Sequence, residues 1–213
     1  MLVAASEYER LTLAPARSSP VEVPPPGRVL ARSSFHTDGP LFFAEAASRR
    51  HTQTMQTVYE AAGGEEGLLR LARAWHARVM ADDVVSHAFS HGFHPEHSER
   101  LAAYWAEALG GPRTYSDNYG DETSVVRIHS GNGPHEEMDR RAIACFDQAM
   151  TDVGLSESDP VRAVLHDYFA WATTTTMSRF HQSADDVPTG LRIPHWSWDG
   201  LVGGTGFSSR AGT

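Results

Sequence analysis

The stretch that decides the fold is Glu99-Arg-Leu-Ala-Ala-Tyr-Trp-Ala-Glu-Ala-Leu-Gly-Gly-Pro-Arg-Thr-Tyr-Ser116. Its first part has the apolar spacing of a helix face, and the Gly-Gly-Pro sequence ends that helix because glycine and proline do not continue it. A polar loop follows, and a short apolar run then leads from Val125 to an isolated histidine, His129. The stretch therefore predicts a helix followed by a separate turn that carries one histidine toward the interior.

The helical spacing of apolar residues continues on both sides of this stretch. Leu68, Leu71, Trp75 and Val79 recur at offsets of three and four, which is the period of a helix with one buried face. No segment shows the sustained apolar–polar alternation of a half-buried strand. The sequence therefore predicts an all-α class, with helices over residues 58–62, 65–80, 82–89, 95–109, 135–153 and 158–180 and a short apolar turn over 125–130.

Composition excludes several classes of function. The net charge of −9 argues against a nucleic-acid binder, because phosphate contacts need clustered cations. All 18 basic residues are arginine, and a chain without lysine has no Schiff-base, pyridoxal-phosphate or P-loop chemistry. Cys145 is the single cysteine, which excludes internal disulfides, cysteine-ligated iron–sulfur clusters and covalently attached c-type haem. We interpret Cys145 as a small buried hydrophobic residue.

The two ends of the chain differ from its middle. Residues 1–54 hold six of the 12 prolines and have no sustained periodicity, so we expect a disordered extension, with Met55 as a candidate for the true start. We expect the functional domain over 55–182 and a tail with glycine and tryptophan over 183–213. The first residues lack the apolar core of a signal peptide, and no run approaches the roughly 18 apolar residues of a membrane span. We therefore expect a cytoplasmic protein without a membrane partner.

Three histidines are predicted to face the interior. His76 lies at the edge of the apolar stripe of its helix, and His97 shares a helix face with Leu101 and Tyr104. Taken alone, each is more typical of a half-buried histidine bonded to a backbone carbonyl than of a ligand. A third interior histidine on a short turn, His129, favours a site. A haem pocket needs one neutral imidazole for the iron, apolar walls and polar groups on the opposite side.

Several motifs also favour a haem pocket. They are Tyr59, Ala61 and Gly63-Gly64 near the start, the acidic pair Asp82-Asp83, Glu99 to Leu101, and Arg127 with His129. The most specific motif is Gly110-Gly-Pro-Arg-Thr-Tyr-Ser116 with a histidine downstream. Together they make the chain resemble the truncated haemoglobins, group II in particular. The resemblance implies a two-over-two helical globin fold that binds one haem b without a covalent bond.

Carried over residue by residue, the resemblance gives His129 the role of the proximal iron ligand. His97 matches the first distal position of the haem-facing helix, and His76 falls where the family usually has a ligand-binding tyrosine. Phe89 falls where the family carries an aromatic side chain packed on the haem. The other expected haem contacts are the apolar walls Leu101, Tyr104 and Trp105 and the propionate partners Arg100 and Arg127.

Two positions depart from the family pattern. Group II usually places a distal tryptophan where this chain has Ala142, and the usual distal tyrosine is His76. The resemblance therefore implies a distal site that is rich in imidazole and less crowded. His97 or His76 either donates a hydrogen bond to bound oxygen or binds the iron directly and gives a six-coordinate resting state.

Three functions remain open from the sequence. The first is a globin that binds oxygen and other diatomic gases, either for transport or for nitric-oxide or peroxide chemistry with a reductase as partner. The second is a non-haem metal enzyme that uses His91, His94 and His97, with His135 as a further ligand. The third is a globin-fold sensor or interaction module without haem, whose tail with Trp196 and Trp198 contacts a partner.

Overall fold

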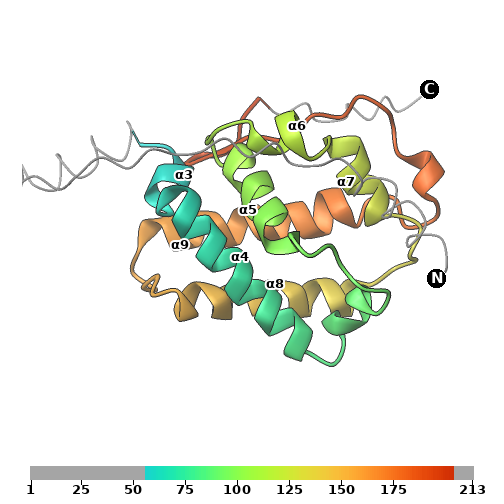
Figure 1. Cartoon of the computed structure of the whole chain (residues 1–213), viewed down its shortest axis with the longest axis horizontal. Helices are drawn as coiled ribbons and strands as arrows, with labels where there is room; N and C mark the ends of the chain where they lie inside the picture. Colours follow the sequence, from blue (N-terminus) through green and yellow to red (C-terminus); the bar gives the residue numbers. More distant parts are fainter. Residues whose placement is uncertain (1–55, 204–213) are drawn as a thin grey trace, which may run out of the picture. The chain divides into compact units, whose positions relative to one another are not determined.

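The computed structural model describes residues 56–203. The predictions of a disordered extension over residues 1–54 and of a start at Met55 lie outside these residues. The α-helices of Figure 1 are α3 (Val58–Ala61), α4 (Gly64–Ala81), α5 (His97–Ala108), α6 (Thr114–Asn118), α7 (Glu122–Ile128), α8 (Glu136–Asp152) and α9 (Pro160–Trp171). Shorter elements are the 3₁₀-helices η1 (Val85–Phe89) and η3 (Ala184–Asp186), the π-helix η2 (Ala172–Met177) and the strands β1 (Trp196–Ser197) and β2 (Gly200–Leu201). The prediction of an all-α globin-like class is confirmed, although this two-stranded hairpin was not expected.

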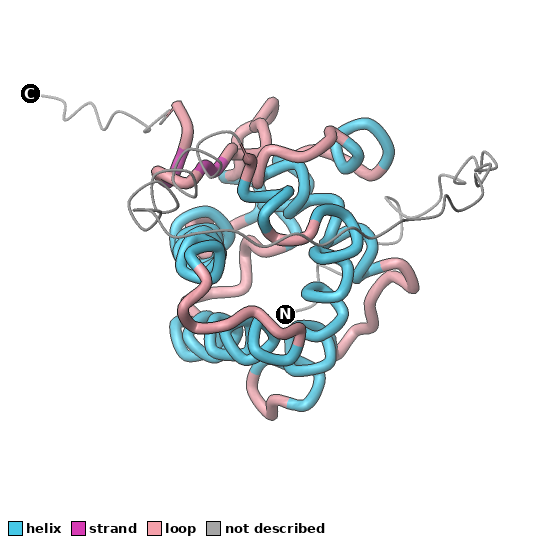
Figure 2. The backbone as a smooth tube through the Cα atoms, turned by 90° about the vertical axis from the view of Figure 1, so that its left-hand side faces the viewer, coloured by secondary structure: helices cyan, strands magenta, loops and turns pink. Residues whose placement is uncertain are grey.

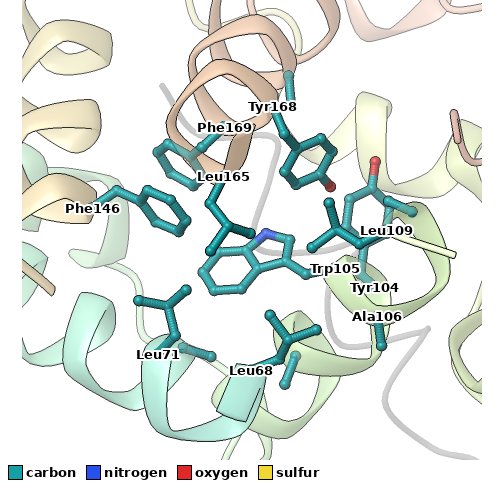
Figure 3. Close-up of a cluster of buried hydrophobic side chains, with 14 of the residues drawn as sticks. Leu68, Leu71, Tyr104, Trp105, Ala106, Leu109, Phe146, Leu165, Tyr168 and Phe169 are labelled. Carbon is teal, nitrogen blue, oxygen red and sulfur yellow. The ribbon is translucent and has the colours of Figure 1, made fainter. Parts of the chain in front are cut away.

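Two helix pairs enclose the core. α4 packs against α5, α8 packs against α9, and α4 also crosses α8 (Figure 1). Trp105 of α5 lies between the pairs (Figure 3), with edge contacts to Phe146 and Phe169 at centroid distances of 5.3 and 5.9 Å. Phe146 of α8 and Phe169 of α9 stack with centroids 4.1 Å apart. The core thus joins the two pairs in the two-over-two arrangement that the resemblance implies.

The junction between α3 and α4 depends on glycine. Gly63 and Gly64 have φ angles of 91° and 63°, which side chains with a Cβ rarely adopt. Gly67, one turn into α4, approaches the preceding chain so closely that a Cβ there would lie 2.0 Å from the carbonyl oxygen of Ala62. The glycines therefore allow α4 to begin immediately after α3 and to pack on it.

The segment between α5 and α8 is more helical than predicted. The expected loop after Pro112 contains α6, and the expected turn over 125–130 is the end of the two-turn helix α7. Asp121 begins α7 by accepting a hydrogen bond from the backbone N–H of Ser124, which is the usual action of an N-cap aspartate. Helix α5 begins at His97 rather than at Pro95. The element predicted over 82–89 is only a 3₁₀-helix, η1.

The helix predicted over 158–180 changes its geometry before it ends. The α-helix α9 stops at Trp171, and residues Ala172–Met177 continue as the π-helix η2. The π segment contains the four threonines 173–176, whose β-branched side chains disfavour the α-helix. Such single-turn π segments are uncommon and often lie near functional sites.

The tail packs on the helices. Val187 and Ile193 are buried, and Trp196 and Trp198 pack against the main core. The strands β1 and β2, magenta in Figure 2, form a small antiparallel hairpin. Cys145 is also buried, as predicted. Within residues 56–203, no helix is both long and apolar enough to cross a membrane.

Candidate functional site

His129 lies at the C-terminal end of α7, where its side chain is held by its own helix. Its Nδ1 atom donates to the carbonyl oxygen of Val125 at a distance of 2.8 Å. A carbonyl oxygen only accepts hydrogen bonds, so Nδ1 carries the proton and Nε2 keeps a free lone pair. The backbone of α7 thereby fixes both the tautomer and the direction of the ring.

The surroundings keep His129 neutral. Burial is the largest of the causes that lower its pKa, and the charge of His135 lowers it further, while the bond to Val125 and the charge of Asp139 act in the opposite direction. Yet part of the His129 side chain is exposed. Because its surroundings disfavour the charged form, His129 is a neutral imidazole whose Nδ1 is bonded to its own helix.

His76 of α4 and His97 of α5 form a second imidazole group. Their ring centroids are 5.0 Å apart, and the Nδ1 atom of each is buried without a hydrogen-bond partner. Burial lowers the pKa of both, that of His97 to about 4, and the charges of His76 and His129 add to the effect on His97. The three imidazoles are therefore neighbours in one electrostatic environment, and all three are neutral at pH 7.

Aromatic rings surround the histidine pair. Phe89 lies 5.4 Å from His76 and 5.3 Å from His97, measured between ring centroids. Phe93 lies 4.5 Å from His76 and 6.1 Å from His97, although 43% of its surface is exposed. Sequence reasoning named Phe89 but missed Phe93, because Phe93 lies in a loop without periodicity.

The remaining predicted wall residues lie further along α5. Leu101 is partly buried against the main core, and Trp105 lies inside it (Figure 3). The Tyr104 hydroxyl donates to the carboxylate oxygen Oε2 of Glu122 at 2.8 Å. The structure thus gathers His76, Phe89 and His97 and places Tyr104 and Trp105 among other core side chains. The buried Glu122 was missed, since nothing in its spacing distinguishes it from an exposed helix-start residue.

The histidines of the rival metal site do not converge. Within residues 56–203, no group of three His, Cys, Asp or Glu side chains is placed to hold a metal ion. His94 uses its Nδ1 atom to accept from the backbone N–H of Glu96, and His97 turns into the aromatic group. His135 bonds to Asp139 at 2.9 Å. The non-haem alternative is therefore not supported.

Comparison with known proteins decides the family. Residues 57–173 match the family described as bacterial-like globin, which is more than half of the chain. The chain belongs to the bacterial-like globins. A haemoglobin from Chloroflexus aurantiacus is similar, with 29% identity, a TM-score of 0.50 and coverage of 58% of this chain and 99% of that chain.

Group II members share the fold. The group II truncated haemoglobin of Bacillus anthracis has 22% identity and a TM-score of 0.50, and the match covers 63% of this globin and 96% of that chain. The resemblance to truncated haemoglobins is thus confirmed, and the globin family implies haem as the cofactor of this globin.

The residues of this globin fit a haem. Nε2 of His129 would be available to hold the iron, and the unpartnered nitrogens of His76 and His97 would provide polar groups for a ligand. The Nε atoms of Arg100 and Arg127 are also buried without a hydrogen-bond partner, and guanidinium groups pair well with carboxylates. Arg100 also has partners within the protein, since its Nη2 atom lies 3.8 Å from a carboxylate oxygen of Glu96 and its guanidinium carbon lies 5.1 Å from the Tyr119 ring centroid.

This globin has Ala142 at the position where group II usually places a tryptophan. Ala142 of α8 is buried beside Val79, Val85 and Cys145. Its carbonyl oxygen accepts a hydrogen bond of 3.1 Å from Nε1 of Trp75, which precedes His76 on α4. The indole N–H of Trp75 is therefore engaged with the backbone of α8.

Proposed function

We propose that this globin binds one haem b non-covalently through Nε2 of His129 and binds oxygen and other diatomic gases at the iron. The hydrogen bond from His129 to Val125 carries the proposal. It holds the imidazole in the tautomer that a metal needs, and an acceptor on the second nitrogen makes a histidine a stronger ligand. Bound haem supplies an iron that takes a gas ligand and exchanges electrons.

The other residues have separate tasks in this proposal. His97 and His76 are neutral, so either of them has one N–H to donate to a polar ligand. Phe89 and Phe93 keep water away from the ligand, because their rings pack on both imidazoles. Arg127 binds a haem propionate with its buried guanidinium nitrogen.

A second candidate is redox turnover of nitric oxide or peroxide with electrons from a reductase. The observation that favours it is the proximity of two neutral imidazoles, His76 and His97, because a neutral histidine has both an N–H donor and a nitrogen acceptor for hydrogen bonds to a polar reactant. The cytoplasm, where thiols such as that of Cys145 remain reduced, is the location that we propose for either function.

The test is the absorption spectrum after haem addition, for the wild type and for His129→Gly. A matched control is His166→Gly, because His166 pairs with Asp147 on the surface. We expect a Soret band in the wild type and in the control, a weakened and altered band in His129→Gly, and its recovery when free imidazole is added.

Two other results are informative. A wild type without a Soret band would contradict the proposal and favour the haem-free sensor, for which His129 is dispensable. Six-coordinate bands in the ferrous protein without added ligand would show that a distal imidazole binds the iron, and their loss in His97→Leu or His76→Leu would identify which one.

A further inference from the structure

Residues 178–191 lie beyond the part of the chain that matches the globin family, which ends at residue 173. We call this segment the strap. One of its attachments near His129 is made by Thr123, which is 6% exposed in the first turn of α7. The Thr123 hydroxyl donates to the carbonyl oxygen of Pro188 at 3.3 Å and accepts from the backbone N–H of Leu191 at 3.1 Å. A single buried side chain thus joins the strap to the helix that carries His129.

The second attachment follows His129 in the chain. The backbone N–H groups of Gly131 and Gly133 donate to the carbonyl oxygens of Phe180 and His181 at 2.9 and 3.0 Å. Gly131 has a φ of 73°, and a Cβ there would lie 3.3 Å from the backbone nitrogen of Ala184, so the two segments are in close contact. His129 therefore lies between two attachments to the strap, one on each side.

The N-terminal end of the strap, at Ser178, is held to α8 by side chains. Ser178 donates to one carboxylate oxygen of Asp139 at 2.6 Å, and His135 bonds to the other at 2.9 Å. The strap also buries Val187, which is 3% exposed. Its attachments thus begin beside α8 and continue along α7.

Helix α7 depends on such contacts. It has seven residues, and isolated helices of this length are unstable in water, so that their position comes from tertiary packing. The bond from His129 to Val125 fixes the ring relative to α7 but not α7 relative to the other helices. Tertiary contacts must therefore hold the helix itself. The Tyr104–Glu122 bond ties its first residue to α5, and the bonds of Thr123 and Gly131 tie it to the strap.

We propose that the strap is a positioning element for the proximal histidine, and that Thr123 is the positioning residue through which it acts. The strap fixes α7 and so sets the direction in which Nε2 of His129 meets the iron. The effect on the iron rests on the proposed function, whereas the effect on α7 does not.

The test compares Thr123→Val, which keeps the shape and removes the hydroxyl, with Thr123→Ser, which keeps the hydroxyl. Thr174→Val is the matched control, because the exposed Thr174 hydroxyl in η2 donates to the carbonyl oxygen of Ala170, four residues earlier in α9, and makes no bond to the strap or to α7 that the described residues show. We expect amide hydrogen exchange over residues 122–131 of the full chain without haem to become about tenfold faster in Thr123→Val. Thr123→Ser and the control retain the wild-type rate.

The second measurement is the iron–histidine stretching vibration of the ferrous protein with haem. We expect it to shift in Thr123→Val and to return in Thr123→Ser. An unchanged exchange rate in Thr123→Val would overturn the proposal, and so would faster exchange with an unchanged vibration. Absence of a Soret band in the wild type would instead contradict haem binding, and the exchange result would still decide whether the strap holds α7. If Thr123→Val does not fold, Thr123→Cys provides a side chain of similar size with weak hydrogen bonding.

Discussion

The imidazole rings of His76 and His97 lie 5.0 Å apart although they belong to different helices. The close packing of α4 on α5 produces this pair, and burial keeps both members uncharged. Because neither Nδ1 atom has a hydrogen-bond partner in the protein, each ring retains polar capacity that a ligand can satisfy. An unsatisfied buried polar atom is unfavourable for folding, so the pair is better explained by ligand binding than by stability.

Removing one distal imidazole should weaken the retention of oxygen. We expect His97→Leu to raise the oxygen dissociation rate of the ferrous protein about tenfold, since one hydrogen bond to the ligand is lost. Stopped-flow displacement of oxygen by carbon monoxide measures this rate. The variant His76→Leu identifies the donor. If His97 donates the hydrogen bond, His76→Leu raises the oxygen dissociation rate less than His97→Leu does. Wild-type rates in both variants would show that neither ring contacts the ligand.

Arg127 should affect the affinity for haem more than the stability of the fold. Its buried Nε atom has no partner in the protein, so a propionate is its expected partner. We expect Arg127→Gln to release haem to an acceptor protein about tenfold faster, which corresponds to about 1.4 kcal/mol. Arg113→Gln is the control, because the Arg113 side chain is 72% exposed. Equal haem loss in both variants would remove Arg127 from the haem contacts.

Glu122 should make the folded state less stable as the pH rises. Burial raises its pKa from 4.5 to about 7, and the hydrogen bond from Tyr104 only partly opposes this. Between these values the folded state binds more protons than the unfolded state, so the contribution of Glu122 to stability is full below pH 4.5 and is lost toward pH 7. The loss is on the order of 3 kcal/mol.

The measurement compares the wild type with a variant, because the lowered pKa of His97 changes the stability with pH in the opposite direction. Between pH 4 and pH 6.5 the unfolded state binds more protons at His97, so this residue makes stability rise with pH. Urea unfolding of the wild type and of Glu122→Gln across pH 4.5–7.5 isolates the carboxyl group. We expect the stability of Glu122→Gln relative to the wild type to increase with pH, and a constant difference would refute the assignment.

The aromatic contact between α8 and α9 should be the main source of stability between these helices. Phe146 is 1% exposed and stacks on Phe169 with an interplanar angle of 2°. We expect Phe146→Ala to lower the free energy of unfolding by about 3–5 kcal/mol. Phe93→Ala should cost far less, because Phe93 is 43% exposed. Chemical denaturation measures both, and similar losses in the two variants would contradict this view of the core.

Periodicity was sufficient to predict the long helices. The stripe that contains Leu68, Leu71 and Val79 does face the core in α4, and the glycines after α5 do end that helix. The family motif also placed His129 at the end of an apolar run, where the structure has α7. These features are local, so a sequence contains the information that determines them.

The features that sequence reasoning missed depend on distant partners. Glu122 is buried where Tyr104 of another helix bonds to its carboxylate. Likewise, the two bonds of Thr123 go to residues more than 60 positions away, at separations of 65 and 68. The π-helix had a visible signal in its threonine run, but β-branching alone does not distinguish a π segment from a frayed helix end.

Val187 and Ile193 are buried although they lie beyond the residues that match the family. The end of the family match and the end of the folded unit are therefore different positions in this chain. The match to the family model ends at residue 173, inside the π-helix, yet these two side chains are 3% and 6% exposed. Each buried aliphatic side chain contributes about 1.5–3 kcal/mol, against a total of about 5–15 kcal/mol for a typical domain. A chain shortened to the region of similarity would leave apolar surface in contact with water and would tend to aggregate. The unit that folds in this chain is therefore larger than the part that matches the family model.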